Sequence, residues 1–236
     1  MRKLIATVLL MVPGLAFAAG AGIPLERAPI DLSDRESLQR GASLFVNYCA
    51  GCHSADYMRY NRIARDLGIP EDQLAGNLMF ATSASGEPMH VAMSRGDATE
   101  WFGKAPPDLS VTSRSHGANW LYTFLRTFYV EEGRPFGVNN ATFKDVGMPH
   151  VLWELQGFSE PVMQDGLVVG VGPASGGKLS AAEYDRVVTD LVAFMVYLGE
   201  PIILERKRIG VWVLLFLAVF MVLAILLKKE YWRDVH

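Results

Sequence analysis

Cysteine is nearly absent from this sequence: its 236 residues include only Cys49 and Cys52. A disulfide framework is therefore excluded, because two cysteines can form at most one bridge. Internal repeats and low-complexity tracts are also lacking. The length suits one substantial domain, with room for membrane segments, since half of the residues are hydrophobic and 20% are charged.

Positive charge is scarce in the middle of the chain. Residues 19–205 contain 14 Lys and Arg against 23 Asp and Glu, a net charge of −9. Such a surface repels nucleic acid, so no nucleic-acid partner is expected, and it would steer a basic protein partner toward the domain. A merely solvated acidic surface explains the charge equally well, so charge alone identifies no partner.

Charge is missing altogether from residues 209–227, which read IGVWVLLFLAVFMVLAILL. As a helix, this run would be roughly 28 Å long, close to the ~30 Å hydrocarbon core of a bilayer. A buried core helix fits poorly, because apolar residues would surround the whole helix and charged residues stand at both ends. The run predicts a transmembrane helix. Three basic residues at 206–208 and three at 228–233 balance each other and do not orient it.

The N-terminus has the pattern of a secretory leader. Arg2 and Lys3 precede the apolar residues 4–12, and Ala-Phe-Ala at 16–18 is a small-x-small cleavage site. An uncleaved anchor fits less well, because the apolar run is shorter than the ~20 residues that a span needs. We therefore predict a signal peptide at 1–18, an exported domain at 19–205, an anchor with a basic flank at 206–228 and a cytoplasmic tail at 229–236.

Both cysteines lie in NYCAGCHSAD, residues 47–56, which contains Cys-x-x-Cys-His. This is the attachment pattern of c-type haem: Cys49 and Cys52 add to the two vinyl groups, and His53 supplies the proximal nitrogen to iron. A dithiol redox motif does not need the histidine, and a zinc site would need two further ligands. The pattern predicts one covalent haem c.

Two amphipathic helices are predicted around this motif. Ser33 and Glu36 have capping-box spacing before a helix that leads into Cys49, and Ser180 and Glu183 repeat the spacing before a helix ending at Gly199. Gly41 inside the first helix suggests that the second one approaches it closely. The predicted fold is mainly α, and its two helices around the motif resemble a class I cytochrome c-like haem domain with long loop insertions. No strand pattern competes strongly, although residues 166–172 suggest a short hairpin arm.

A sixth iron ligand must come from the residues that follow the motif. Met148 is favoured, because Gly147 lets the backbone approach a porphyrin and Pro149 keeps the loop extended. His150 is the second choice, and Met195 on the apolar face of the last helix is most simply a core residue. The remaining candidates are Met58, Met79, Met89, Met93, Met163, His90 and His116.

The order of motifs resembles the cytochrome c1 family, the haem subunit of the cytochrome bc1 complex, over nearly the full chain. The resemblance rests on CAGCHS, APPDLS at 105–110, RSHG at 114–117, GMP at 147–149, YLGEP and the C-terminal anchor. It implies that Met148 is the axial ligand opposite His53. It also implies that Arg114 lies near a haem propionate and helps to bind the cofactor.

The resemblance implies an electron-transfer subunit of a respiratory quinol–cytochrome c reductase. Single electrons would pass from a Rieske iron-sulfur protein through haem c to a soluble or membrane-bound cytochrome c. The subunit would not be an enzyme on its own, and it would join cytochrome b in a dimeric complex of the bacterial inner membrane, with its haem domain in the periplasm. Alternatives are a haem enzyme such as a peroxidase, and a membrane-tethered c-type cytochrome of another oxidase chain.

Overall fold

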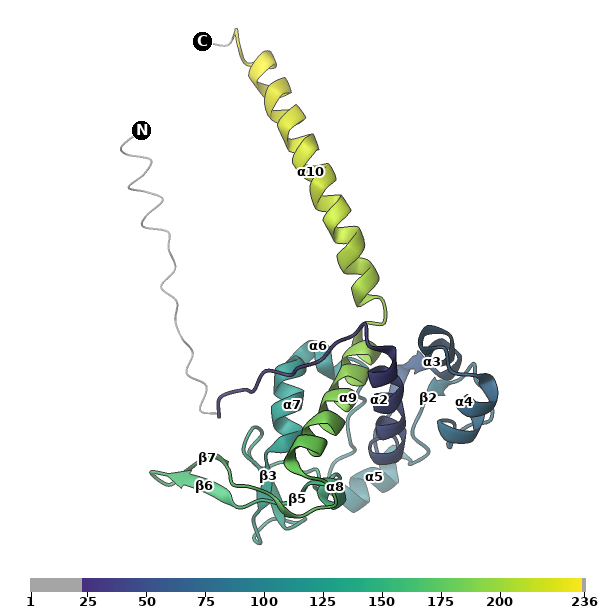
Figure 1. Cartoon of the computed structure of the whole chain (residues 1–236), viewed down its shortest axis with the longest axis vertical. Coiled ribbons are helices and arrows are strands. Elements are labelled where there is room, and N and C mark those ends of the chain that lie inside the picture. Colours follow the sequence, from purple (N-terminus) through teal and green to yellow (C-terminus); the bar gives the residue numbers. More distant parts are fainter. Residues whose placement is uncertain (1–22, 235–236) are drawn as a thin grey trace.

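The computed structural model describes residues 23–234, so the leader predicted at 1–18 lies outside the described residues. The fold is mainly α, as predicted, with a cluster of helices from which one long helix projects (Figure 1). Helix α2 (Arg35–Tyr48) and helix α9 (Ala181–Gly199) lie side by side in its centre. They are the two amphipathic helices that the sequence predicts.

The crossing of α2 and α9 depends on Gly41. A Cβ atom at this position would stand 2.1 Å from the carbonyl oxygen of Asp190 and 2.6 Å from Cβ of Phe194. Below this contact the rings of Phe45 and Phe194 pack with their centroids 5.6 Å apart, and both side chains are fully buried. The close approach that Gly41 suggests is confirmed, and it brings the end of α2 against α9.

Helix α9 begins with the predicted capping box. The Ser180 hydroxyl accepts from the backbone N–H of Glu183, and the Glu183 carboxylate accepts from the backbone N–H of Ser180 at 2.9 Å. Both N-terminal donors are thereby satisfied, which fixes the first turn of the helix.

The corresponding prediction for α2 is wrong, because its N-cap is Asp34 rather than Ser33. The Asp34 carboxylate accepts from the backbone N–H of Ser37 at 3.0 Å. Ser33 is engaged in a turn instead, where its hydroxyl and its backbone N–H both donate to Asp31. Aspartate is as good a cap as serine, so this turn shifts the helix start by one residue.

Shorter elements fill the long connection between α2 and α9. Four two-stranded antiparallel sheets occur among the described residues, pairing β1 with β2, β3 with β4, β5 with β8 and β6 with β7. The helices are α3 (Tyr60–Leu67), α4 (Glu71–Asn77), α5 (Arg95–Phe102), α6 (Thr112–His116), α7 (Ala118–Arg126) and α8 (Trp153–Gln156). The strands are β1 (Ala55–Arg59), β2 (Pro88–Met89), β3 (Phe128–Val130), β4 (Val138–Asn140), β5 (Gly157–Phe158), β6 (Pro161–Gln164), β7 (Leu167–Val171) and β8 (Ser175–Gly176).

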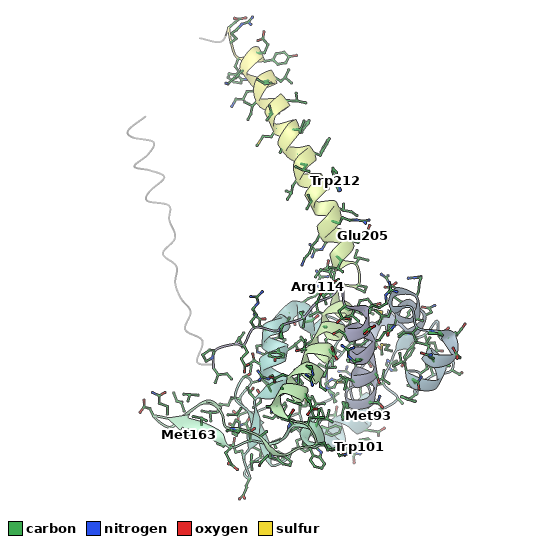
Figure 2. The ribbon with its side chains drawn as sticks, in the orientation of Figure 1. Met93, Trp101, Arg114, Met163, Glu205 and Trp212 are labelled. Atoms are coloured by element: carbon green, nitrogen blue, oxygen red, sulfur yellow. The ribbon has the colours of Figure 1, made fainter. Side chains whose placement is uncertain are left out.

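The β6–β7 hairpin confirms the arm that residues 166–172 suggest. Figure 1 shows it reaching out from the body of the domain, and Met163 on it is labelled in Figure 2. The other strands are two to five residues long, too short for an alternating pattern to reveal them in the sequence. They fasten loops together rather than form a core sheet.

Helix α10 (Ile203–Tyr231) follows α9 after three residues and projects away from the domain (Figure 1). It is long and apolar enough to cross a membrane, and none of its residues is buried by the rest of the chain. The predicted span 209–227 lies inside it, and the basic residues at 206–208 continue the same helix. Trp212 marks its first apolar turns in Figure 2.

Candidate haem site

The Cys-x-x-Cys-His motif forms a tight turn at the end of α2. Cys49 is the C-cap residue, and its carbonyl accepts from the backbone N–H of Cys52 at 3.0 Å and from that of His53 at 2.9 Å. The fold thereby brings both thiols and the imidazole to the wall of one cavity. Neither cysteine forms a disulfide.

The surroundings of Cys49 favour its neutral thiol. Cys49 is buried, and burial, reinforced by neighbouring Cys52, raises its pKa to about 12. A neutral thiol is a poor metal ligand and a poor nucleophile for disulfide exchange. Within residues 23–234, no group of three or more His, Cys, Asp or Glu side chains could hold a metal ion. Covalent attachment to an apolar cofactor fits a buried Cys49 on the wall of this cavity.

His53 is held in one tautomer. Its Nδ1 lies 2.7 Å from the carbonyl oxygen of Pro107, which can only accept, so Nδ1 carries the proton. Burial lowers the pKa of His53, which keeps the ring neutral, although the Pro107 hydrogen bond partly opposes this effect. Nε2 is then the nitrogen with a free lone pair. This is the arrangement in which histidine ligates a metal.

The cavity has a volume of about 380 Å³ and a largely apolar wall. Its size falls within the range of cofactor pockets. An aromatic stack forms part of the wall: Trp120 lies 4.2 Å from His116 and 4.9 Å from Phe124, measured between ring centroids. The lining residues include Tyr48, Cys49, Cys52, His53, Phe102, Lys104, Pro107, His116, Trp120, Phe124, Phe143, Met148, Leu191 and Met195. Such an apolar wall, with His53 and two methionines on it, suits a flat apolar cofactor that is ligated by the protein.

The candidates for the sixth ligand differ in whether they line this cavity. Met148, Met195 and His116 line it, whereas His150 is buried elsewhere, stacked on Phe128 at 4.9 Å. The sequence places Met195 in the core without reference to the cavity, although its four-residue spacing from Leu191 puts both on one face of α9. Met58, Met79, Met89, Met93, Met163 and His90 are not among the lining residues.

Met148 and Met195 differ in how they are held. Met195 projects from α9 and is 4% exposed, packed among the core side chains. Met148 is half-buried on an irregular segment between Gly147 and Pro149. A side chain on such a loop can approach the cavity without displacing a helix.

Arg114 lies apart from the other predicted site residues. It is exposed and is not among the residues that line the cavity. Its side chain packs at the end of α9, where a Cβ on Gly199 would come 3.2 Å from its Cγ. The hydrogen bond from Arg206 lowers the pKa of Glu200, and the charge of Arg114 adds to this effect. Figure 2 shows Arg114 near the base of α10. Its propionate role stays a prediction, and Lys104 is a cation that does line the cavity.

The fold and the site define a class I c-type cytochrome domain carried on a single membrane helix. The model of the Cytochrome C1 family matches residues 26–235, and the chain belongs to this family. A cytochrome c1 of Allochromatium vinosum is 52% identical over the whole of both chains. The ammonia monooxygenase gamma subunit of Nitrosomonas europaea is 47% identical over all of this chain and 99% of the relative. A cytochrome b/c1 of Bradyrhizobium diazoefficiens is 26% identical, with 88% of this chain matching 34% of the relative.

Family membership gives the chain its role. It is the electron-transfer subunit of a cytochrome bc1 complex, beside cytochrome b and the Rieske protein, and it carries one covalent haem c. Helix α10 anchors it to a membrane.

Proposed function

We propose that this chain relays single electrons from the Rieske iron-sulfur protein to a cytochrome c through a haem ligated by His53 and Met148. The observation that carries this proposal is that Cys49, Cys52, His53 and Met148 share the wall of one apolar cavity. Haem c, when bound, supplies an iron that alternates between the ferrous and ferric states. The protein supplies the attachment, the ligands and the exclusion of water.

Each of the four residues has a distinct part in this proposal. Cys49 and Cys52 form the thioethers, and His53 presents Nε2 while Pro107 holds Nδ1. Met148 supplies a soft, neutral sulfur that favours ferrous iron and raises the reduction potential relative to a second histidine. With two protein ligands, no position is left for a substrate on the metal. A relay that is not an enzyme on its own therefore fits better than a peroxidase.

The proposed placement and charge of the domain indicate which acceptor it would meet. The proposed leader at 1–18 would export residues 19–205 to the periplasm of a bacterial inner membrane, with α10 as anchor and residues 229–236 as a cytoplasmic tail. The exported domain carries a net charge of −9, which would steer a basic cytochrome c toward it. We propose a cytochrome c as the acceptor, and we propose that the complex to which this chain belongs is dimeric.

Purification of the tagged full-length chain in mild detergent tests this function. We expect cytochrome b and a Rieske protein in equal amounts with this chain, and an intact mass of residues 19–236 plus one haem. Co-purification with ammonia monooxygenase subunits would instead support the role named for the Nitrosomonas relative. Recovery with another oxidase would support the tethered-cytochrome alternative.

A further inference from the structure

The loop that holds His53 is itself fastened to the segment after the haem motif. Its backbone is tied directly, because the N–H of Leu109 donates to the carbonyl of Ser54 at 2.8 Å. The hydroxyl of Ser110, which is 1% exposed, accepts from the backbone N–H of Tyr57 at 3.1 Å. The loop 105–110, which contains Pro107, therefore lies along Ser54 and the first residues of β1.

Asp108 bridges the two sides of this junction. One carboxylate oxygen accepts from the backbone N–H of Asp56 at 2.8 Å, and the other accepts from the backbone N–H of Ser110 at the same distance. The first bond ties the loop to the motif segment, and the second closes a turn within the loop. Aspartate can place one oxygen on each N–H group, whereas asparagine has a single oxygen for both and glutamate is longer by a methylene.

We propose that Asp108 is a positioning residue, which holds the Pro107 carbonyl against His53 Nδ1 and thereby sets the orientation and basicity of the proximal imidazole. A hydrogen bond from Nδ1 raises the donor strength of the opposite nitrogen. A stronger donor stabilises ferric iron, so a loosened loop raises the reduction potential. This inference rests on the ligation by His53 proposed above.

A purely electrostatic role is the alternative, because the Asp108 charge also acts on the His53 ring. Two substitutions separate the roles. Asp108→Glu keeps the charge but misplaces the carboxylate, whereas Asp56→Asn removes a neighbouring charge and keeps the backbone N–H that Asp108 binds. The Asp56 side chain accepts from His90 at 2.8 Å and makes no contact with Pro107 among the described bonds.

The test uses the full-length, haem-loaded chain in detergent, with electron paramagnetic resonance of the ferric form and a redox titration. The g values of low-spin ferric haem depend on the orientation of the axial ligands. We expect Asp108→Ala to shift these g values. We also expect it to raise the ferrous-to-ferric ratio at a fixed applied potential at least tenfold, which corresponds to a rise in reduction potential of about 59 mV or more. Asp108→Glu should shift the g values in the same sense, and Asp56→Asn should leave them unchanged.

Wild-type g values in Asp108→Glu would overturn the positioning role, and this variant decides the matter if Asp108→Ala fails to incorporate haem. A potential shift no larger in Asp108→Ala than in Asp56→Asn would also overturn it. A wild-type spectrum without histidine–methionine ligation would overturn both this inference and the proposed site. The two failures are thus distinguishable.

Discussion

Helices α9 and α10 are neighbours in the chain, and both are rich in apolar residues, yet they occupy opposite environments. Helix α9 is buried in the domain, with residues 191–195 buried throughout and with Val188, Val192 and Phe194 at 0% exposure. Helix α10 buries none of its side chains against the rest of the chain. The difference lies in the charged residues: α9 carries Glu183, Asp185, Arg186 and Asp190 in its first half, whereas residues 209–227 of α10 contain none. Other parts of the domain surround α9, and lipid surrounds α10.

The two helices also differ in how their first turns are stabilised. Helix α9 starts with the Ser180–Glu183 capping box, whereas Ile202, the N-cap of α10, makes no side-chain hydrogen bond. The turn between them is held by Arg206, which donates to the Glu200 carboxylate at 3.0 Å. Packing and caps stabilise α9, while α10 depends on its length and on the bilayer.

Gly41 of α2, which packs against α9, and Gly210 of α10 offer the strongest contrast. Gly41→Leu should prevent folding of the haem domain or destabilise it by about 3 kcal/mol or more, because the new side chain meets the backbone of α9. Gly210→Leu on α10 should leave the unfolding midpoint unchanged, since nothing lies within 4 Å of its Cβ position. Thermal unfolding of both full-length variants, followed by haem absorbance, makes the comparison. Equal midpoints would show that the α2–α9 crossing is looser than described.

Removal of α10 should change location without changing the site. A chain ending at Glu205 is expected to be water-soluble and to retain its haem, because the cavity lies wholly within the domain. It should lose stable assembly with its membrane partners, since the helix contacts would be gone. Fractionation and haem staining provide the readouts. A truncated chain that still pellets with membranes after a high-salt wash would reveal a second attachment.

The caps should give the smallest effect. Ser180→Ala is expected to lower the free energy of unfolding by about 1 kcal/mol, because one N-terminal donor of α9 loses its acceptor. Ile202→Ala is the matched control, because this N-cap makes no side-chain hydrogen bond. Chemical denaturation of the haem-loaded chains measures both. A larger loss of unfolding free energy in Ile202→Ala would mean that the start of α10 contributes more to the stability of the domain than the Ser180 cap of α9 does.

Local chemistry made much of the fold predictable. Gly41 inside a helical pattern indicated the α2–α9 crossing, and the spacing of Ser180 and Glu183 indicated the start of α9. The same spacing failed at Ser33, because Asp31 competes for its hydroxyl and Asp34 offers an equally good cap. Capping residues specify a helix start only when no neighbour can take their place.

The cavity wall was less predictable, because it is built from contacts between distant segments. Met195 belongs to a regular core pattern, and only the tertiary structure shows that part of this face borders the cavity. The stack of Trp120 and Phe124 likewise reads as ordinary core on α7. Arg114 follows a recognisable motif, but its side chain lies by Gly199 and not on the cavity wall.

The most direct measurement compares Met148→Leu with Met195→Leu, two substitutions of similar volume at two methionines that line one cavity. Each should cost less than ~1.5 kcal/mol in packing, so both chains should fold. Met148→Leu is expected to lose the methionine–iron absorption band. It should also lower the ferrous-to-ferric ratio at a fixed applied potential more than tenfold, which corresponds to a fall in reduction potential of more than about 59 mV. Met195→Leu should retain both. Loss of the band in Met195→Leu, with the band retained in Met148→Leu, would contradict the proposed ligation.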